Sequence, residues 1–178
     1  EKGADPNIDV NGDGSAIIMA GRSNNTEILH LLISYKTDIN KVTIGDGTAL
    51  IQAATLGNID MVKALVKLGA DVNKEADKDG NPLIAAAKNG HIEIVEFLVD
   101  SGADINAHVP GDETPLIRAA WSGHLAVVKY LVEKGADVNK AVRDRYQLNS
   151  EKRSALNMAK RNKHEAVIEY LISVGANQ

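Results

Sequence analysis

The sequence predicts an all-α fold, a solenoid of stacked helix-turn-helix units with projecting loops. Two landmarks recur together along its 178 residues. The first is a Gly-Ala-Asp-x-Asn segment that begins at Gly69 and returns at a constant interval at Gly102 and Gly135, with a shorter copy after a longer interval at Gly175. The second is an apolar residue that keeps the same intervals, at Ile17, Leu50, Leu83, Leu116 and Leu156. Landmarks that recur together at a fixed interval are typical of stacked supersecondary units.

Each unit opens with a residue type that favours a helix N-cap. The five caps are Ser15, Thr48, Asn81, Thr114 and Ser154. Pro82 and Pro115 follow two of these caps at the first helical position, where a missing N–H costs nothing. A short helix is expected next, as in residues 83–87 (LIAAA). A glycine then ends it in three of the units, at Gly57, Gly90 and Gly123.

A longer amphipathic helix follows each short one. Residues 92–99 (IEIVEFLV) place apolar side chains at helical spacing, and a glycine of the first landmark ends the helix. Paired alanines such as Ala53 and Ala54 allow neighbouring helices to approach closely, while Leu, Ile and Val fill the remaining space. Because stacked units bury a continuous strip, the fold needs few rings, which fits an aromatic content of only 3%.

Residues 114–124 (TPLIRAAWSGH), followed by residues 135–139 (GADVN), resemble an ankyrin repeat, and so do the other copies. The resemblance covers essentially the whole chain and implies paired antiparallel helices stacked into a curved solenoid. Residues 109–117 are similar to ankyrin arrays of bacterial proteins, including some attached to membrane sensor metallopeptidases. The chain departs from the family where a histidine often follows Thr-Pro-Leu, and apolar packing is expected there instead. The residues at that position are Ile18, Ile51, Ile84, Ile117 and Asn157.

We expect a single domain over residues 1–178. Its five repeats would cover residues 8–40, 41–73, 74–106, 107–139 and 140–178, with residues 1–7 as the tail of a preceding repeat. In the fifth copy, Asn157, Lys160 and Lys163 replace apolar or small residues. A terminal repeat needs such a polar face because nothing stacks on it. The C-terminus is therefore expected to cap the array, and the N-terminus to be cut from a longer one.

Composition disfavours several function classes. A net charge of −4 argues against an extended surface for nucleic acid or anionic membrane, since both need a basic footprint. No apolar run approaches the roughly 20 residues of a membrane span. Cysteine is absent, which excludes disulfides and thiolate sites. The chain also lacks a nucleophile elbow, a zinc-protease motif and a phosphate loop, so neither catalysis nor a cofactor is expected.

Two patterns imitate metal sites without completing them. Residues 9–15 (DVNGDGS) begin like a calcium loop, but its twelfth position is Ala20 rather than a bidentate Glu. His91, His124 and His164 share one repeat position and so lie about one repeat apart, too far for shared ligation at bonds of about 2 Å. Each histidine is instead expected to support its own inter-helix turn.

An asparagine recurs at the end of three first-landmark segments, at Asn73, Asn106 and Asn139, and at Asn40 in the related segment 36–40 (KTDIN). The resemblance implies that oxygen-dependent hydroxylases modify this position in some eukaryotic members. A role in stabilising the turn is the simpler interpretation.

Partners of ankyrin-like stacks usually contact the loop tips and the exposed positions of the short helices. Trp121 is a large side chain where sister repeats carry Arg22, Thr55 or Lys88, and Leu56 is apolar at an otherwise polar position. Trp and Arg are typical anchors of interfaces. The expected contact set is Trp121, Arg118, Leu56, Gln52, Thr55, Lys88, Arg22, Arg161, Asp77 and Asp112. Partial burial of Trp121 without a partner, and a merely solvated basic face, are the alternatives.

The charges in this set predict a bipolar groove. Its helix positions are basic, at Arg22, Lys88, Arg118 and Arg161. Its loop tips are acidic, at Asp46, Asp77, Asp79, Asp112 and Glu113. Such an arrangement would orient a partner more than it would tighten binding.

The sequence thus predicts a monomeric, non-catalytic module that binds a protein partner through its concave groove and loop tips. It predicts no contact with nucleic acid or membrane. The alternative is a structural spacer or regulatory sensor portion of a larger, membrane-anchored protein. The fifth repeat also holds seven extra residues within positions 142–153. They form either a contact arm carrying Arg143, Arg145 and Tyr146 or a tolerated surface insertion.

Overall fold

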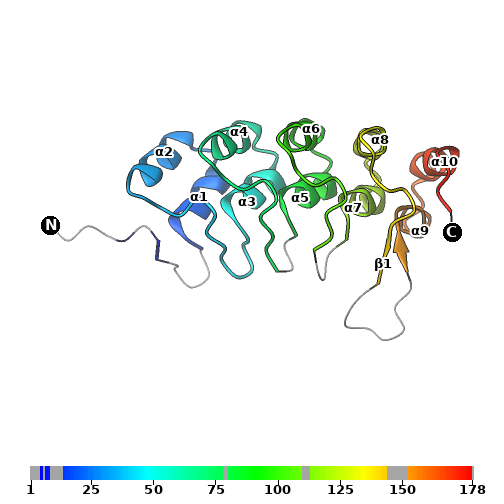
Figure 1. The fold of residues 1–178 in the computed structure, drawn as a ribbon, viewed down its shortest axis with the longest axis horizontal. Helices are drawn as coiled ribbons and strands as arrows, with labels where there is room; N and C mark the ends of the chain where they lie inside the picture. Colours follow the sequence, from blue (N-terminus) through cyan, green and yellow to red (C-terminus); the bar gives the residue numbers. More distant parts are fainter. Residues whose placement is uncertain are drawn as a thin grey trace.

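The computed structural model describes residues 5, 7, 8, 14–77, 80–109, 113–143 and 152–177. These residues form ten helices and two short strands (Figure 1). In chain order the helices are α1 (Ala16–Ser23), α2 (Thr26–Ser34), α3 (Ala49–Leu56), α4 (Ile59–Lys67), α5 (Pro82–Asn89), α6 (Ile92–Asp100), α7 (Pro115–Ser122), α8 (Leu125–Glu133), α9 (Ala155–Arg161) and α10 (Glu165–Ser173). The strands are β1 (Ala141–Val142) and β2 (Arg153–Ser154).

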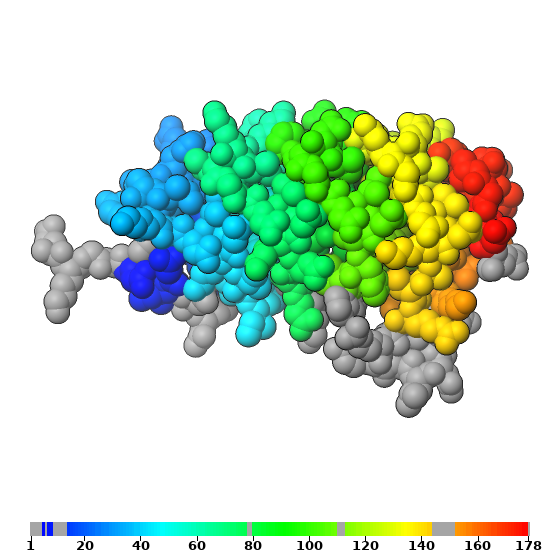
Figure 2. All heavy atoms as spheres, in the orientation of Figure 1, coloured from blue at the N-terminus to red at the C-terminus, as the bar shows by residue number. Residues whose placement is uncertain are grey.

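The helices form two rows. The short helices α1, α3, α5, α7 and α9 lie side by side, and the long helices α2, α4, α6, α8 and α10 lie side by side next to them; the described parts of the loops between repeats extend past the short helices (Figure 1). Neighbouring short helices pack more closely than neighbouring long ones, so the array bends toward the short helices and that side is concave. Each repeat forms one slice of an elongated body (Figure 2). The predicted all-α solenoid is confirmed.

Hydrogen bonds at the helix starts confirm four of the five predicted caps. The side chains of Thr48, Asn81, Thr114 and Ser154 each accept a hydrogen bond from the backbone N–H three residues later. Ser15 is the N-cap residue of α1, as predicted, but its side chain makes no capping hydrogen bond. The three predicted glycines end their helices in the left-handed region, with φ of +75° to +79°.

Small and branched apolar side chains fill the core, as expected. Ile18, Ile51, Ile84 and Ile117, which stand where the family often has histidine, are at most 2% exposed. The paired alanines are fully buried between short helices. In the first repeat the second alanine is replaced by Gly21, where a Cβ atom would lie 2.5 Å from the Ala49 carbonyl oxygen. The packing of α1 against α3 therefore requires glycine at that position.

The histidine row links neighbouring repeats, which corrects the expectation that each histidine supports its own turn. His91 Nε2 lies 3.1 Å from the Thr55 carbonyl oxygen. His124 Nε2 lies 3.1 Å from the Lys88 carbonyl oxygen, and His164 Nε2 lies 2.9 Å from the Trp121 carbonyl oxygen. The imidazole reaches that far because it packs over the glycine that ends the short helix of the preceding repeat. A Cβ atom on Gly90 would lie 2.5 Å from His124 Nδ1.

The recurrent asparagine also bridges repeats, while the aspartate two residues before it stabilises the turn. Asp71 accepts a hydrogen bond from the Asn73 backbone N–H at 2.9 Å, inside one turn. Asn73 Oδ1 accepts from the backbone N–H of Asp104 in the next repeat at 2.8 Å, and its Nδ2 donates to the Gly102 carbonyl at 3.1 Å. The Oδ1 bond to the next repeat recurs at Asn7, Asn40, Asn106 and Asn139. A ladder of these bonds thus runs along the array.

A two-stranded hairpin closes the base of the fifth-repeat insertion, which the sequence did not predict. Strands β1 and β2 pair antiparallel, with Ala141 opposite Ser154 and Val142 opposite Arg153. Arg143 is exposed at the end of this hairpin, whereas Arg145 and Tyr146 of the expected contact arm lie outside the described residues. Three other predicted features also lie outside them: the calcium-like residues 9–13, Asp79 and Asp112. No helix in the described ranges is long and apolar enough to cross a membrane.

Candidate partner-binding groove

The short helices bring one repeat position into a line on the concave side. We call this line the short-helix row, and it consists of Arg22, Thr55, Lys88, Trp121 and Arg161. Lys88 and Arg161 are exposed, while Arg22, Thr55 and Trp121 are half-buried. Leu56, next to the row on α3, is 52% exposed. Apolar and cationic side chains therefore reach solvent together on this side of the array.

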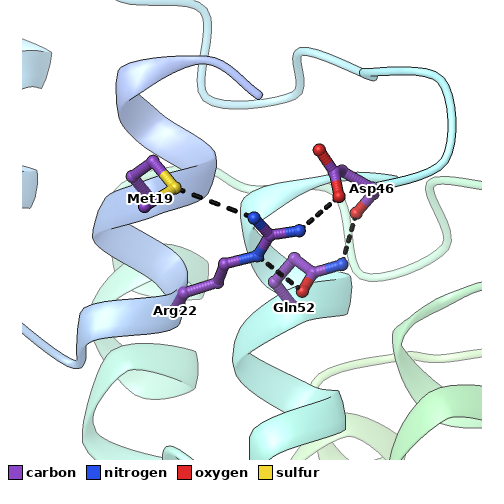
Figure 3. A network of polar contacts seen from close by, with 4 residues as sticks. All are labelled: Met19, Arg22, Asp46 and Gln52. Atoms are coloured by element: carbon purple, nitrogen blue, oxygen red, sulfur yellow. Dashed lines mark hydrogen bonds and ion pairs between the residues drawn. The ribbon is translucent and has the colours of Figure 1, made fainter. Parts of the chain in front are cut away.

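Arg22 is held in a network between the first two repeats (Figure 3). Its Nη2 pairs with Asp46 Oδ1, and its Nε donates to Gln52 Oε1 at 3.1 Å. Gln52 in turn donates to the Asp46 backbone carbonyl at 2.6 Å, and Arg22 Nη1 lies 3.7 Å from Met19 Sδ. The network joins α1, α3 and the loop before α3. Two expected contact residues, Arg22 and Gln52, thus form part of the packing between repeats.

A buried carboxylate holds Arg118. Glu113 is fully buried, with Oε2 3.0 Å from Arg118 Nε and Oε1 2.8 Å from Nη1 of Arg153 on β2. Both arginine side chains remain only about a fifth exposed, at 22% and 23%. Glu113 stands where the earlier repeats have Gly14, Gly47 and Gly80. It therefore joins α7 to the hairpin of the fifth repeat.

These contacts correct the expectation of a bipolar groove. Arg22 and Arg118 do not face solvent as cations opposite acidic loop tips, because each is paired with one of those acids. Sequence reasoning placed the opposite charges on the right elements but could not show that they touch. Lys88 and Arg161 have no carboxylate partner within the described residues.

Residues of the fifth repeat contact Trp121. The guanidinium carbon of Arg161 lies 5.7 Å from the centroid of its ring, a cation–π distance. The Trp121 carbonyl accepts hydrogen bonds from Asn162 Nδ2 at 2.7 Å and from His164 Nε2 at 2.9 Å. The indole packs against the core and leaves only part of its surface to solvent. The indole is thus packed on one side and partly open to solvent on the other.

The remaining expected contacts are spread along the array. Thr55 is half-buried and donates to the Ile51 carbonyl at 2.8 Å, so its hydroxyl is used within α3. Asp77 is exposed in the loop before α5. Within the described residues no group of three His, Cys, Asp or Glu side chains could hold a metal ion.

Family models match most of the chain. A model of ankyrin repeats in three copies matches residues 2–76 and 73–142, and a model of ankyrin repeats in many copies matches residues 122–172. No curated protein matches the chain. Ankyrin repeats are in general modules of protein–protein interaction and are generally non-catalytic. The chain belongs to the ankyrin-repeat family.

Proposed function

We propose that this chain binds a protein partner through the short-helix row and the exposed residues beside it, without catalysing a reaction. One observation carries the proposal: Leu56, Lys88, Trp121 and Arg161 expose apolar and cationic surface on the concave side. Different repeats supply these side chains, so a partner lying along the row would contact several repeats at once.

The chemistry of these residues suggests how the partner is held. The partly exposed indole of Trp121, packed against the core and against Arg161, would lose little entropy on binding and serve as the anchor. The exposed half of Leu56 would contribute about 1 kcal/mol on burial. Lys88 and Arg161 would face carboxylates or carbonyl oxygens of the partner and set its orientation.

Site-directed photo-crosslinking in a lysate of the source organism tests this proposal. A photoreactive amino acid replaces Lys88 on α5 in one variant and Lys63 on α4 in a matched control, since both lysines are exposed and lie on opposite helix rows. We expect a discrete crosslinked protein from position 88 and none from position 63. Crosslinks from position 63 alone would contradict binding of the partner through the short-helix row.

A second candidate function is a spacer that packs against its own parent chain, and the surface of α2 favours it. Ile28 is 44% exposed, whereas the residues at its position in later repeats, such as Met61 and Ile94, are at most 1% exposed. Leu31 and Tyr35 of the same helix face are 56% and 67% exposed. In the crosslinking experiment, products containing only peptides of the parent chain would support the spacer over the adaptor.

A further inference from the structure

Charge is distributed unevenly along the array. Residues 140–178 hold eight Lys and Arg residues against four Asp and Glu, while residues 1–139 hold twelve against twenty. Between positions 152 and 164 there are five Lys and Arg residues and no acid. The acidic net charge of the chain therefore hides a basic fifth repeat.

Three of these cations surround a hollow on α9. The hollow is open and shallow, encloses about 690 Å³, and is lined by Lys152, Asn157, Met158, Lys160 and Arg161. Met158 is only 2% exposed. Asn157 Nδ2 donates to the Lys152 carbonyl at 3.3 Å and so ties the segment before β2 to α9. The three cations are thus carried by ordered backbone. We call this surface the basic hollow.

The need to cap the array explains only part of this surface. Ile117 and Ala120, the counterparts of Asn157 and Lys160 in the fourth repeat, are buried at the contact between α7 and α9. No described helix stacks on the outer side of α9, so polar groups are expected there, and neutral or mixed charges would serve equally well. Capping therefore does not account for three cations in one place.

Several other cations of the chain are already paired with its own acids. Arg22, Arg118, Arg153 and Lys134 each contact a carboxylate of the chain. Among the described residues, no carboxylate contacts Lys152, Lys160 or Arg161. Arg161 instead covers the Trp121 ring. Because like charges that share a hollow repel one another, an anion bound there would be stabilised by all three.

We propose that the basic hollow binds an acidic segment of a protein partner, a short run of Asp and Glu residues. The charge is complementary, and the hollow has room for several side chains. A long polyanion such as nucleic acid fits less well, because the preceding repeats carry an excess of acid that would repel it. Arg161 belongs to both surfaces, but the inference does not rest on the proposed function, because Lys152 and Lys160 lie outside the short-helix row and only these two are changed in the test.

Fluorescence anisotropy with a labelled hexaglutamate peptide tests the proposal. The variants are Lys152→Glu/Lys160→Glu and, as a control with the same change of charge, Lys63→Glu/Lys67→Glu on α4. We expect saturable binding to the unchanged protein that weakens as salt rises from about 50 to about 150 mM, because screening shortens the reach of the charges. We expect the first variant to lose at least about tenfold in affinity and the control to lose less than about twofold.

Several outcomes would overturn the proposal. One is equal loss of affinity in both variants, which would show a response to net charge alone. Others are unchanged binding in Lys152→Glu/Lys160→Glu, or equally tight binding of hexaglutamine. Tighter binding of inorganic phosphate or duplex DNA than of hexaglutamate would replace the proposed ligand class. Salt-dependent dimerisation in sedimentation experiments, abolished in Lys152→Glu/Lys160→Glu, would make a second copy the occupant. Circular dichroism and the milder Lys152→Gln/Lys160→Gln variant check that a loss does not arise from unfolding.

Discussion

Glu113 and Arg153 occupy the same position in neighbouring repeats and form an ion pair, with Oε1 and Nη1 2.8 Å apart. Arg118 holds the other carboxylate oxygen, so one buried acid serves two arginines. Earlier repeats have glycine at this position, where no side chain can form such a pair. The ion triad thus fastens the fifth repeat, which carries the basic hollow and the polar contacts to Trp121, onto the fourth.

Glu113→Gln should destabilise the protein. The amide keeps the shape of the side chain but removes the charge, which leaves two largely buried arginines without a counter-ion, so we expect a loss of roughly 3 kcal/mol in the free energy of unfolding. Urea denaturation measures this loss. Glu93→Gln on the exposed surface of α6 is the control and should change stability by less than about 0.5 kcal/mol. Equal stability of the two variants would show that the triad contributes nothing.

Gly90→Ala should cost more than Gly102→Ala. Both glycines have positive φ, +75° and +91°, so both substitutions carry the left-handed penalty of about 1–2 kcal/mol. At Gly90 the new Cβ atom would also meet the His124 ring, 2.5 Å from Nδ1. A Cβ atom on Gly102 would have no neighbour within 4 Å. Thermal unfolding of both variants, alone and combined with His124→Ala, checks the prediction. The difference between them should vanish once the ring is removed, and its persistence would contradict the packing described.

Asn73→Ala should remove the hydrogen bonds between repeats at one position of the ladder. The Asp104 backbone N–H then loses its acceptor in the preceding repeat, so its hydrogen exchange should accelerate. Asn73→Asp keeps an oxygen for that N–H and loses only the bond from Nδ2 to the Gly102 carbonyl, so it should retain most of the protection. Each lost bond is worth about 1 kcal/mol. Equal exchange of the Asp104 amide in both variants would contradict the ladder.

Stability should fall at high pH because of two tyrosines on the long helices. Burial, and then the negative charge of Asp100, raises the pKa of Tyr130 above 10.0. Burial, and then Glu133, raises the pKa of Tyr170 in the same direction. A raised pKa means that the folded protein favours the neutral phenol. The contribution of the two tyrosines to the free energy of unfolding is therefore fully present below pH 10 and is lost as pH rises through their folded pKa values. Tyr130→Phe/Tyr170→Phe should flatten the decline in urea denaturation series above pH 10, and an unchanged decline would contradict this origin.

Local patterns predicted the fold well. The recurring landmarks, the caps and the helix-ending glycines place all ten described helices, because each signal acts within one repeat. Contacts between repeats were harder to predict. The partner of His124 is the Lys88 carbonyl in the preceding repeat, and residue spacing alone does not show which way a ring turns.

One contact between repeats did leave a signal in the sequence. Glu113 and Arg153 have opposite charges at one repeat position in successive copies, and that register could have suggested their pairing. The pairing of Arg22 with Asp46 left no comparable signal, because the two residues occupy different repeat positions and meet only through the shape of the loop.

The affinity of the crosslinked partner for the Trp121→Ala variant tests the central claim most directly. Tyr35→Ala is the matched control, because Tyr35 is an aromatic side chain, 67% exposed, at the end of α2 in the long-helix row. If the short-helix row binds the partner, Trp121→Ala should weaken binding by at least about 2 kcal/mol, roughly thirtyfold, as removal of an interface anchor does, while Tyr35→Ala changes it little. Unchanged affinity of a folded Trp121→Ala variant would contradict the account.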